Sequence, residues 1–280
     1  MSFTKYQSLE DRVVLVSGGA SGIGEAFVRA FADNGARVAF LDLQEEAGQA
    51  LVKSLAGSAR HAPLFIRCDV TRTDDLKTAI AEAGRKLGPA SALINNAAND
   101  QRQTFADVTP EEFDRTIAVN FRHVYFASQA VVPQMVERGG GSFVFNSSAA
   151  SLVAGQVRFG YQVAKAGLNA VTRFIAAKYG RHGIRANATL PFVVGGEVGA
   201  VAGSQNCIGR SGTAEEIGEA VVFLLSDRAS VITGQVIHLD GGLFTRASWP
   251  TNAAPYQPPP PPSESGPKEA NRGREVNGNN

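Results

Sequence analysis

The stretch 12-RVVLVSGGASGIG-24 decides the fold. Its first half, 12-RVVLVS-17, is a short valine-rich run of the kind found in parallel strands that are buried on both faces. Its second half places glycines at 18, 22 and 24 at the start of an amphipathic stretch. Such glycines let the backbone turn tightly and bring the first turn of a helix against a pyrophosphate. The stretch therefore predicts a strand, a phosphate-binding loop and a helix in succession.

The same alternation of apolar strands and amphipathic helices continues to about Phe244. Two predicted helices begin with capping boxes, 109-TPEE-112 and 213-TAEE-216. Because parallel strands joined by helices require right-handed crossovers, the pattern predicts an α/β fold. We expect a single Rossmann-type doubly wound parallel sheet of about seven strands, with helices on both faces. The predicted strands are 12–17, 37–42, 62–68, 91–96, 142–147, 185–190 and 235–240, and the predicted helices are 22–34, 44–56, 72–87, 110–137, 160–181 and 213–226.

The composition of the chain changes from about Ala247 onward. The run 258-PPPPP-262 is followed by 263-SESGPKEANRGREVNGNN-280, which has few apolar residues. Such a segment cannot offset the entropy lost on ordering. We therefore predict a nucleotide-binding domain at 1–246 and a proline-rich disordered tail at 247–280. The proline run could also serve as a ligand for a proline-binding domain.

Composition and charge exclude several classes of protein. The net charge of the 280 residues is +1 and no basic stripe occurs, so neither nucleic acid nor an anionic membrane is expected as a partner. No apolar run approaches the roughly 18 residues of a membrane span, and the opening MSFTKYQSLEDR lacks the apolar core of a signal peptide. Two distant cysteines, Cys68 and Cys207, indicate reduced thiols in the cytoplasm. Four histidines without an HExxH motif predict no metal site.

The end of the second predicted strand indicates which dinucleotide would bind. The strand ends at Asp42, 18 residues after Gly24. A carboxylate at that distance can accept both hydrogen bonds from the adenosine ribose diol and would repel a 2′-phosphate. The next residue, Leu43, offers no compensating cation. The sequence therefore predicts NAD rather than NADP. The runs 68-CDVT-71 and 95-NNAAN-99 also follow strands, at the edge where open α/β sheets bind ligands.

A tyrosine and a lysine stand one helical turn apart in 161-YQVAK-165. On a helix these two residues share a face, so both can point into one cleft. A free phenol has a pKa near ~10, and a nearby ammonium favours the phenolate. Lowering that pKa by about three units requires about 4 kcal/mol. The pair would then act as a general acid/base near neutral pH. An isolated YxxxK motif also arises by chance on ordinary helices.

The full set of motifs resembles the short-chain dehydrogenase/reductase family. The resemblance covers about residues 8–244. It rests on 17-SGGASGIG-24, Asp42, 69-DV-70, 95-NNAA-98, Asn120 in 118-AVNF-121, Ser148, 161-YQVAK-165, 209-GRSGTAEEI-217 and 240-DGG-242.

The resemblance implies catalytic roles. Tyr161 would exchange a proton with the substrate oxygen, and Lys165 would lower the Tyr161 pKa and hold the nicotinamide ribose. Ser148, 13 residues before Tyr161, would hydrogen-bond the reacting oxygen, with Ser147 ranked second. Asn120 would hold a helix distortion and a water that links Lys165 to solvent.

The resemblance also implies a cofactor site. It includes the phosphate loop, the two ribose pockets, the adenine pocket and the wall after the fourth strand. The implied residues are Ser17, Gly18, Ser21, Gly22, Ile23, Gly24, Asp42, Leu43, Asp69, Val70, Asn96, Ala97, Tyr161, Lys165, Pro191 and Val194.

The chain departs from the family pattern after the sixth predicted strand. It reads 187-NATLPFVVGGE-197, with Phe192 in place of a glycine and Gly196 in place of the threonine that grips the carboxamide. Only 17 residues separate Pro191 from Gly209, which indicates a short lid, an open cleft and reduced activity. Two milder departures are Ser17 for threonine and NNAA for NNAG.

The predicted substrate is a secondary alcohol or sugar hemiacetal and its carbonyl product. The run 95–126 looks like that of bacterial sugar dehydrogenases of the family, which oxidise an aldose to a lactone with NAD. Asn99, Asp100, Gln101 and Arg102 form a polar cluster suited to hydroxyl-rich ligands. Apolar residues at Phe159, Val153, Val157 and Phe192 instead suit a ring-bearing alcohol or ketone. The predicted substrate-binding residues are Asn99, Arg102, Ser148, Phe159 and Phe192.

The sequence thus predicts an NAD-dependent oxidoreductase with Tyr161 as the general acid/base. A nucleotide-binding scaffold or sensor with little turnover is the alternative of a different class, indicated by Phe192, Gly196 and the short lid. A reductase of fatty-acid β-keto thioesters is a rival within the family, but such enzymes favour NADPH, which Asp42 disfavours. The resemblance further implies a homotetramer or homodimer that buries apolar faces of the helices at 110–137 and 160–181.

Overall fold

The computed structural model of the protein describes residues 3–100, 105–153, 159–195 and 206–245. The predicted tail at 247–280 lies outside the described residues. Four residues named in the sequence argument also lie outside them, namely Gln101, Arg102, Val157 and Gly196.

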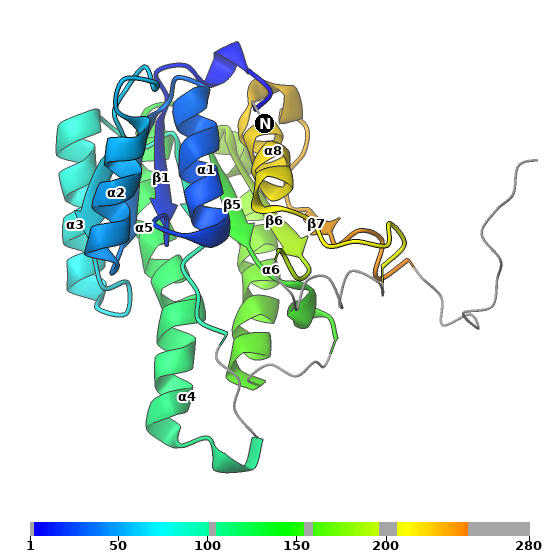
Figure 1. The fold of residues 1–280 in the computed structure, drawn as a ribbon. Coiled ribbons are helices and arrows are strands. Elements are labelled where there is room, and N and C mark those ends of the chain that lie inside the picture. The colour runs from blue at the N-terminus through cyan, green and yellow to red at the C-terminus, as the bar shows by residue number, and fades with distance from the viewer. Residues whose placement is uncertain (1–2, 101–104, 154–158, 196–205, 246–280) are drawn as a thin grey trace, which may run out of the picture. The chain divides into compact units, whose positions relative to one another are not determined.

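A seven-stranded parallel sheet forms the centre of the described domain (Figure 1). The strand order is β3-β2-β1-β4-β5-β6-β7, with the crossover between β3 and β4 placing the two halves of the chain on opposite sides of β1. This order confirms the predicted doubly wound fold. The strands are β1 (Val13–Ser17), β2 (Arg37–Asp42), β3 (Leu64–Arg67), β4 (Ala92–Asn95), β5 (Gly141–Asn146), β6 (Ile184–Pro191) and β7 (Val236–Leu239).

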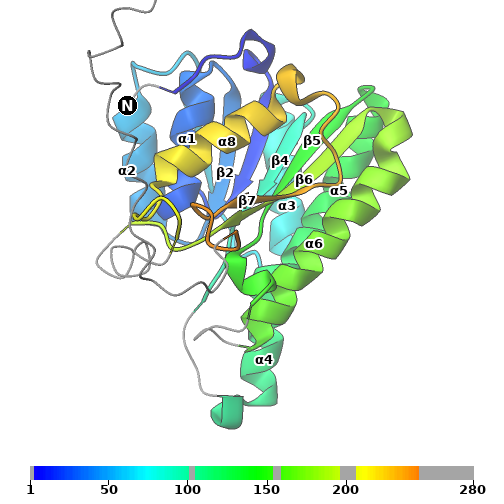
Figure 2. The same ribbon diagram turned by 90° about the vertical axis from the view of Figure 1, so that its right-hand side faces the viewer.

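Helices cover both faces of the sheet (Figures 1 and 2). One face packs against α1 (Gly22–Asp33), α2 (Glu45–Leu55) and α8 (Ala214–Leu225). The other packs against α3 (Thr73–Leu87), α5 (His123–Glu137) and α6 (Phe159–Tyr179). Successive side chains of a strand point to opposite faces of the sheet and so enter different apolar cores. In β1, Val14 and Val16 pack under α1, α2 and α8, whereas Val13 and Leu15 pack on the side of α3, α5 and α6. This explains why the central strands are apolar over their whole length.

The helix predicted at 110–137 is interrupted in the structure. It consists of α4 (Pro110–Ile117), a π-helical turn at Ala118–Arg122 and α5. The predicted capping box begins α4, because Glu112 N donates to Thr109 Oγ1 and Thr109 N donates to Glu112 Oε2. The second predicted box, at Thr213 and Glu216, begins α8 in the same way. In Figures 1 and 2, α4 extends beyond the carboxyl ends of the strands.

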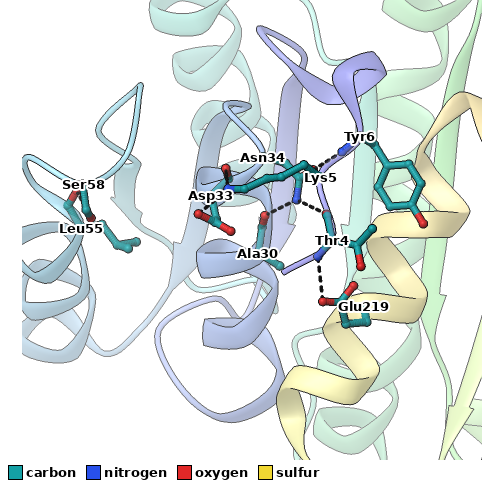
Figure 3. Close-up of polar contacts among 9 residues, drawn as sticks. All are labelled: Thr4, Lys5, Tyr6, Ala30, Asp33, Asn34, Leu55, Ser58 and Glu219. Atoms are coloured by element: carbon teal, nitrogen blue, oxygen red, sulfur yellow. Dashed lines mark hydrogen bonds and ion pairs between the residues drawn. The ribbon is translucent and has the colours of Figure 1, made fainter. Parts of the chain in front are cut away.

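The first described residues form a strap that joins α1 to α8 (Figure 3). Thr4 N donates to Glu219 Oε1 of α8 at 2.9 Å. On the other side, Tyr6 N donates to Asn34 Oδ1 at 2.8 Å, and Asn34 Nδ2 donates to Thr4 O at 3.1 Å and to Ala30 O at 2.9 Å. Asn34 is buried at the end of α1, and its amide forms two hydrogen bonds with the strap and one with Ala30 of α1 itself.

Two negative findings concern the described residues alone. No helix among them is long and apolar enough to cross a membrane. Within the same residues, no group of three or more His, Cys, Asp or Glu side chains is arranged to hold a metal ion. Cys68 is a buried free thiol and Cys207 an exposed one.

Candidate active site

A cleft of about 1110 Å³ opens at the carboxyl ends of the strands. It is the place where open α/β sheets bind ligands. Most of the predicted site residues contribute to its wall. They are Gly18, Ser21, Gly22, Ile23, Gly24, Asp42, Leu43, Val70, Asn96, Ala97, Asn99, Ser148, Tyr161, Lys165, Pro191, Phe192 and Val194.

The glycine loop between β1 and α1 is packed too closely for side chains. A Cβ on Gly24 would lie 1.8 Å from Gly18 O, and a Cβ on Gly18 would lie 2.6 Å from Ala97 Cα. Gly18 also has a φ of +67°, which L residues with side chains rarely adopt. The loop therefore exposes backbone N–H groups at the first turn of α1, which favours an anionic ligand such as a pyrophosphate.

Ser17 lies under this loop and does not belong to the described wall of the cleft. It is buried, and its Oγ accepts from Asn96 N at 3.0 Å and from Ala97 N at 3.2 Å. Asn96 Nδ2 in turn donates to Gly18 O at 2.8 Å. The Ser17 hydroxyl thus joins the end of β1 to the segment after β4 and fixes the position of the glycine loop relative to Asn96 and Ala97.

Asp42 lies at the end of β2 with both carboxylate oxygens engaged by backbone. Oδ2 accepts from Ala20 N at 2.9 Å, and Oδ1 accepts from Gln44 N at 3.0 Å. Gln44 Nε2 donates to Ser21 Oγ at 3.1 Å, across the rim of the cleft. An ionised carboxylate offers about four acceptor positions, so Asp42 retains capacity for the two hydroxyls of a ribose. The sequence did not indicate that Gln44 belongs to the site, because its hydrogen bond to Ser21 joins residues 23 positions apart in the chain.

Asp69 differs from its predicted position. Its neighbour Val70 lines the cleft, whereas Asp69 lines a separate cavity of about 430 Å³ beside it. Asp69 Oδ1 accepts from Thr71 N at 2.9 Å and Thr71 Oγ1 at 2.7 Å, which fixes the turn after β3.

Tyr161 and Lys165 meet in the cleft, as the helical spacing predicts. Lys165 Nζ lies 5.5 Å from the centroid of the Tyr161 ring and donates to Asn146 O at 2.6 Å. The lysine side chain is 2% exposed. Ser148 forms a hydrogen bond with Tyr161, which places two hydroxyls at one point of the cleft. Ser147 Oγ instead donates to the backbone oxygen of Lys165 at 2.8 Å and is thus committed to α6.

The electrostatics of the pair differ from the simple expectation. Burial raises the pKa of Tyr161 to about 12, and this outweighs the hydrogen bond from Ser148, which lowers it. Burial also lowers the pKa of Lys165 to about 8. Burial is the largest cause of both shifts, and neither residue of the pair is among the causes of the other's shift. The pKa of Tyr161 is thus raised, which is opposite to the lowering predicted from its spacing to Lys165.

Asp100 acts on both members of the pair. It lines the cleft, and its negative charge raises the pKa values of Tyr161 and Lys165. The sequence places Asp100 in a polar cluster for substrate, but not beside the catalytic pair. Its effect opposes phenolate formation and favours the charged lysine.

The helix distortion expected at Asn120 is present as the π-helical turn. Asn120 is fully buried, and its Nδ2 donates to Thr116 O at 2.9 Å and to Asn99 O at 3.0 Å. Its Oδ1 accepts from Asn99 N at 2.9 Å. Asn120 is therefore behind the wall of the cleft and fixes the backbone of Asn99, which belongs to the wall.

His123 is a buried group that sequence reasoning missed. It follows the π-helical turn as the first residue of α5 and is 2% exposed. Burial and the nearby charge of Lys165 lower the pKa of His123 to about 3, although the carbonyls of Val119 and Ala118 favour the charged ring. The imidazole is therefore neutral at physiological pH. No sequence motif marks it, because its burial depends on the packing of α5 against α6.

We expect His123 to make the protein less stable as the pH falls from 7 to 5. A histidine with a folded pKa of about 3 binds no proton there, whereas the unfolded chain, with a pKa near ~6.5, does. The free energy of unfolding thus decreases through this window, by roughly 2 kcal/mol at pH 5. Urea denaturation at both pH values measures it.

The control for this prediction is an exposed histidine. His123→Gln should flatten the pH dependence by about the same amount, while His182→Gln should keep the wild-type slope. An unchanged slope in His123→Gln would contradict the assignment.

The substrate residues divide into two groups. Asn99, Ser148 and Phe192 line the cleft, together with Val153. Phe159 is 52% exposed and packs edge-to-face on Phe105, with ring centroids 5.7 Å apart, and is not part of the described wall. Its prediction as a substrate contact is therefore unsupported by the geometry.

The first turn of α8 adds a part of the wall that the sequence did not assign. Thr213, Ala214 and Glu215 line the cleft. They belong to the predicted capping box, which the sequence interprets only as a helix start. Only the packing of α8 beside α1 brings this turn to the cleft.

The chain is similar to a protein family, to individual proteins and to a solved structure. A family model described as enoyl-(acyl carrier protein) reductase matches residues 18–244. The probable galactose dehydrogenase GalD of Rhizobium meliloti (strain 1021) is 40% identical over an alignment of 251 residues, which covers 86% of this chain and 98% of that protein. D-xylose 1-dehydrogenase of Caulobacter vibrioides (strain NA1000 / CB15N) is 36% identical over 253 residues, covering 86% and 99%. The solved ligand-free aldohexose dehydrogenase of Thermoplasma acidophilum superposes with a TM-score of 0.77 at 29% identity, covering 88% of this chain and 99% of that one.

Proposed function

The chain belongs to the short-chain dehydrogenase/reductase family, and from this premise we propose that it is an NAD-dependent sugar dehydrogenase. It would remove hydride from the hydroxyl-bearing carbon of an aldose hemiacetal, with Tyr161 as the general base. The observation that carries the proposal is the meeting of Tyr161, Lys165 and Ser148 in the same cleft as the glycine loop and Asp42.

The residues present fit a dinucleotide. The loop at Gly18 and Gly24 leaves no room for side chains where a pyrophosphate would lie against backbone N–H groups. Asp42, held by Ala20 N and Gln44 N, supplies acceptors for the adenosine ribose. Bound NAD would supply the hydride acceptor and a positive charge near the phenol.

The chain's own residues would handle the proton. The Tyr161 oxygen would take the proton of the substrate hydroxyl as the carbonyl forms, and Ser148 Oγ would donate to the same substrate oxygen. With a pKa of about 8, Lys165 is mostly protonated at neutral pH, so it adds a positive charge that favours the phenolate. Together with the charge of the nicotinamide, this would offset the burial that raises the pKa of Tyr161.

Two features support a sugar as the substrate. The relatives at 40% and 36% identity are a probable galactose dehydrogenase and a D-xylose dehydrogenase. In the cleft, the polar residues Asn99 and Asp100 lie with Tyr161 and Lys165, and Asn120 fixes the backbone of Asn99. Such groups suit a ligand that carries several hydroxyls.

A second candidate substrate is a ring-bearing secondary alcohol or ketone. Its support is the apolar part of the same wall, which includes Val153 and Phe192. An aldose can form hydrogen bonds with Asn99 and Asp100, whereas an apolar ring cannot and would have to pack against Val153 and Phe192.

A spectrophotometric assay separates these candidates. NADH formation is followed at 340 nm with NAD and a panel of D-galactose, D-xylose, L-arabinose, cyclohexanol and borneol. We expect turnover of one or more aldoses. Turnover of the cyclic alcohols alone would favour the ring-bearing alcohol as the substrate. NADH binding without turnover of any compound would favour a nucleotide-binding scaffold.

The coenzyme preference is tested at Asp42. Asp42→Ala removes the acceptors for the ribose and the charge that repels a 2′-phosphate, so the preference for NAD over NADP should fall by about tenfold or more. The ratio of kcat/KM for the two coenzymes measures it. Asp42→Asn, which keeps one acceptor, should give an intermediate ratio. An unchanged ratio in Asp42→Ala would mean that another residue selects the coenzyme.

We propose a homodimer or homotetramer in the cytoplasm. Exposed apolar side chains on α5 and α6, including Tyr125, Val163 and Phe174, support subunit contacts through these helices. The free thiols of Cys68 and Cys207 support a reducing compartment. Light scattering coupled to size-exclusion chromatography measures the stoichiometry.

A further inference from the structure

Arg67 lies beside Asp42 at the carboxyl end of the sheet. The two residues are paired in register on the adjacent strands β3 and β2. Side chains alternate along a strand, so Arg67 shares a face with Phe65, and Asp42 shares one with Phe40. Both phenylalanines pack in the core under α1 and α2. The Arg67 and Asp42 side chains therefore leave the sheet on the same side, from strands about 4.8 Å apart.

The Arg67 guanidinium is held by a carboxylate. Its Nε lies 3.7 Å from Glu45 Oε2, and the two side chains are 65% and 64% exposed. Glu45 is the first residue of α2, which starts three residues after Asp42. An exposed pair at this distance is weak and readily exchanged. The contact is made through Nε, so the terminal nitrogens Nη1 and Nη2, which form the fork that binds phosphate, are not part of it.

Arg67 lies outside the described wall of the cleft and, with Arg72, lines the smaller cavity of about 430 Å³ beside it. Among the described residues that line the cleft itself, Lys165 is the one lysine or arginine. Lys165 is engaged with Asn146 O at the catalytic end, beside Tyr161. A 2′-phosphate on the adenosine ribose would therefore depend on Arg67 and on the first N–H groups of α2.

We propose that the Arg67–Glu45 pair is a determinant of coenzyme selectivity in addition to Asp42. Glu45 partly neutralises Arg67, the cation in register with Asp42, and adds a negative charge at the first turn of α2. The chain would thus exclude NADP by Asp42 and Glu45 together, while keeping in Arg67 a latent phosphate-binding group. The inference deepens the proposed function and rests on dinucleotide binding in the cleft.

The test is the affinity for the two reduced dinucleotides, measured by their own fluorescence in the full-length protein without substrate. Glu45→Gln releases Arg67, so NADPH should bind about three- to tenfold more tightly, and less so at high salt. The affinity for NADH should change less than about twofold, because it has no 2′-phosphate. Unfolding temperatures of all variants check that the fold is retained.

Two further variants isolate the role of Arg67. Glu46→Gln removes the same charge one residue later on α2, where no ion pair with Arg67 is made, and should give a clearly smaller gain. In an Arg67→Gln background, Glu45→Gln should lose most of its effect. The inference is overturned if Glu45→Gln and Glu46→Gln give equal gains, or if the gain persists without Arg67. Absence of binding of either dinucleotide by the wild type would instead overturn the proposed function itself.

Discussion

Tyr161→Phe is expected to lower kcat/KM by about a thousandfold or more, since proton transfer by a positioned side chain contributes 10²–10⁴ to rates in general. The substitution removes one oxygen and keeps the ring, so the packing of α6 and the 5.5 Å approach of Lys165 Nζ to the ring are preserved. Affinity for NADH should change little, because the glycine loop and Asp42 provide most of the expected contacts with the dinucleotide. Steady-state kinetics and a binding titration measure the two quantities separately.

The control for this variant is Tyr179→Phe. Tyr179 ends the same helix, packs against the core and takes no part in the described wall of the cleft. It should retain wild-type kcat/KM. If Tyr161→Phe kept more than about a tenth of the activity, Tyr161 would not be the general base.

Gly24→Ala is expected to weaken dinucleotide binding strongly. The added Cβ would lie 1.8 Å from Gly18 O and 2.7 Å from Asn96 Nδ2, so either the loop or α1 must move. Overpacking of this kind typically costs about 1–3 kcal/mol of stability. The displaced loop would no longer present its N–H groups to a pyrophosphate, and we expect NADH affinity to fall by about a hundredfold or more, which is about 2.7 kcal/mol.

Gly84→Ala is the matched control. Gly84 lies in the interior of α3, and no atom is within 4 Å of the Cβ it would gain. Alanine is favoured over glycine in a helix, so this variant should be as stable as the wild type or up to about 1 kcal/mol more stable. Equal NADH affinity in the two variants, measured by titration, would show that dinucleotide binding does not require the close approach of Gly24 to Gly18.

The order and type of the elements follow from the sequence because buried parallel strands and amphipathic helices have distinct periods. The errors are local. The third strand, predicted at 62–68, is restricted to Leu64–Arg67, since Pro63 has no N–H to donate to a ladder. The helix predicted at 110–137 has the correct limits, but its apolar pattern does not reveal the π-helical turn. That turn depends on Asn120 binding the backbone of Asn99, 21 residues away.

In the candidate site, too, local features could be predicted from the sequence, whereas contacts between distant segments could not. Spacing predicts the glycine loop at Gly18 and Gly24 and the shared helix face of Tyr161 and Lys165, whereas the catalytic role of that pair was predicted from the family resemblance. Arg67 could not be predicted in this way, since its relation to Asp42 depends on the register of two strands. The balance of charges at Tyr161 was also beyond the sequence, because burial depends on the packing of α6.

The strap at the start of the chain has a consequence for biosynthesis. It joins Thr4 to Glu219, positions 215 residues apart, so this hydrogen bond cannot close until α8 has left the ribosome. Until then, the apolar surface that α8 covers, including Val144 of β5 and Phe31 of α1, stays open to solvent on the nascent chain. Because Ala214 and Glu215 of α8 also line the cleft, its wall is completed only late in synthesis, and a chain that terminates before residue 214 would lack this part of the wall.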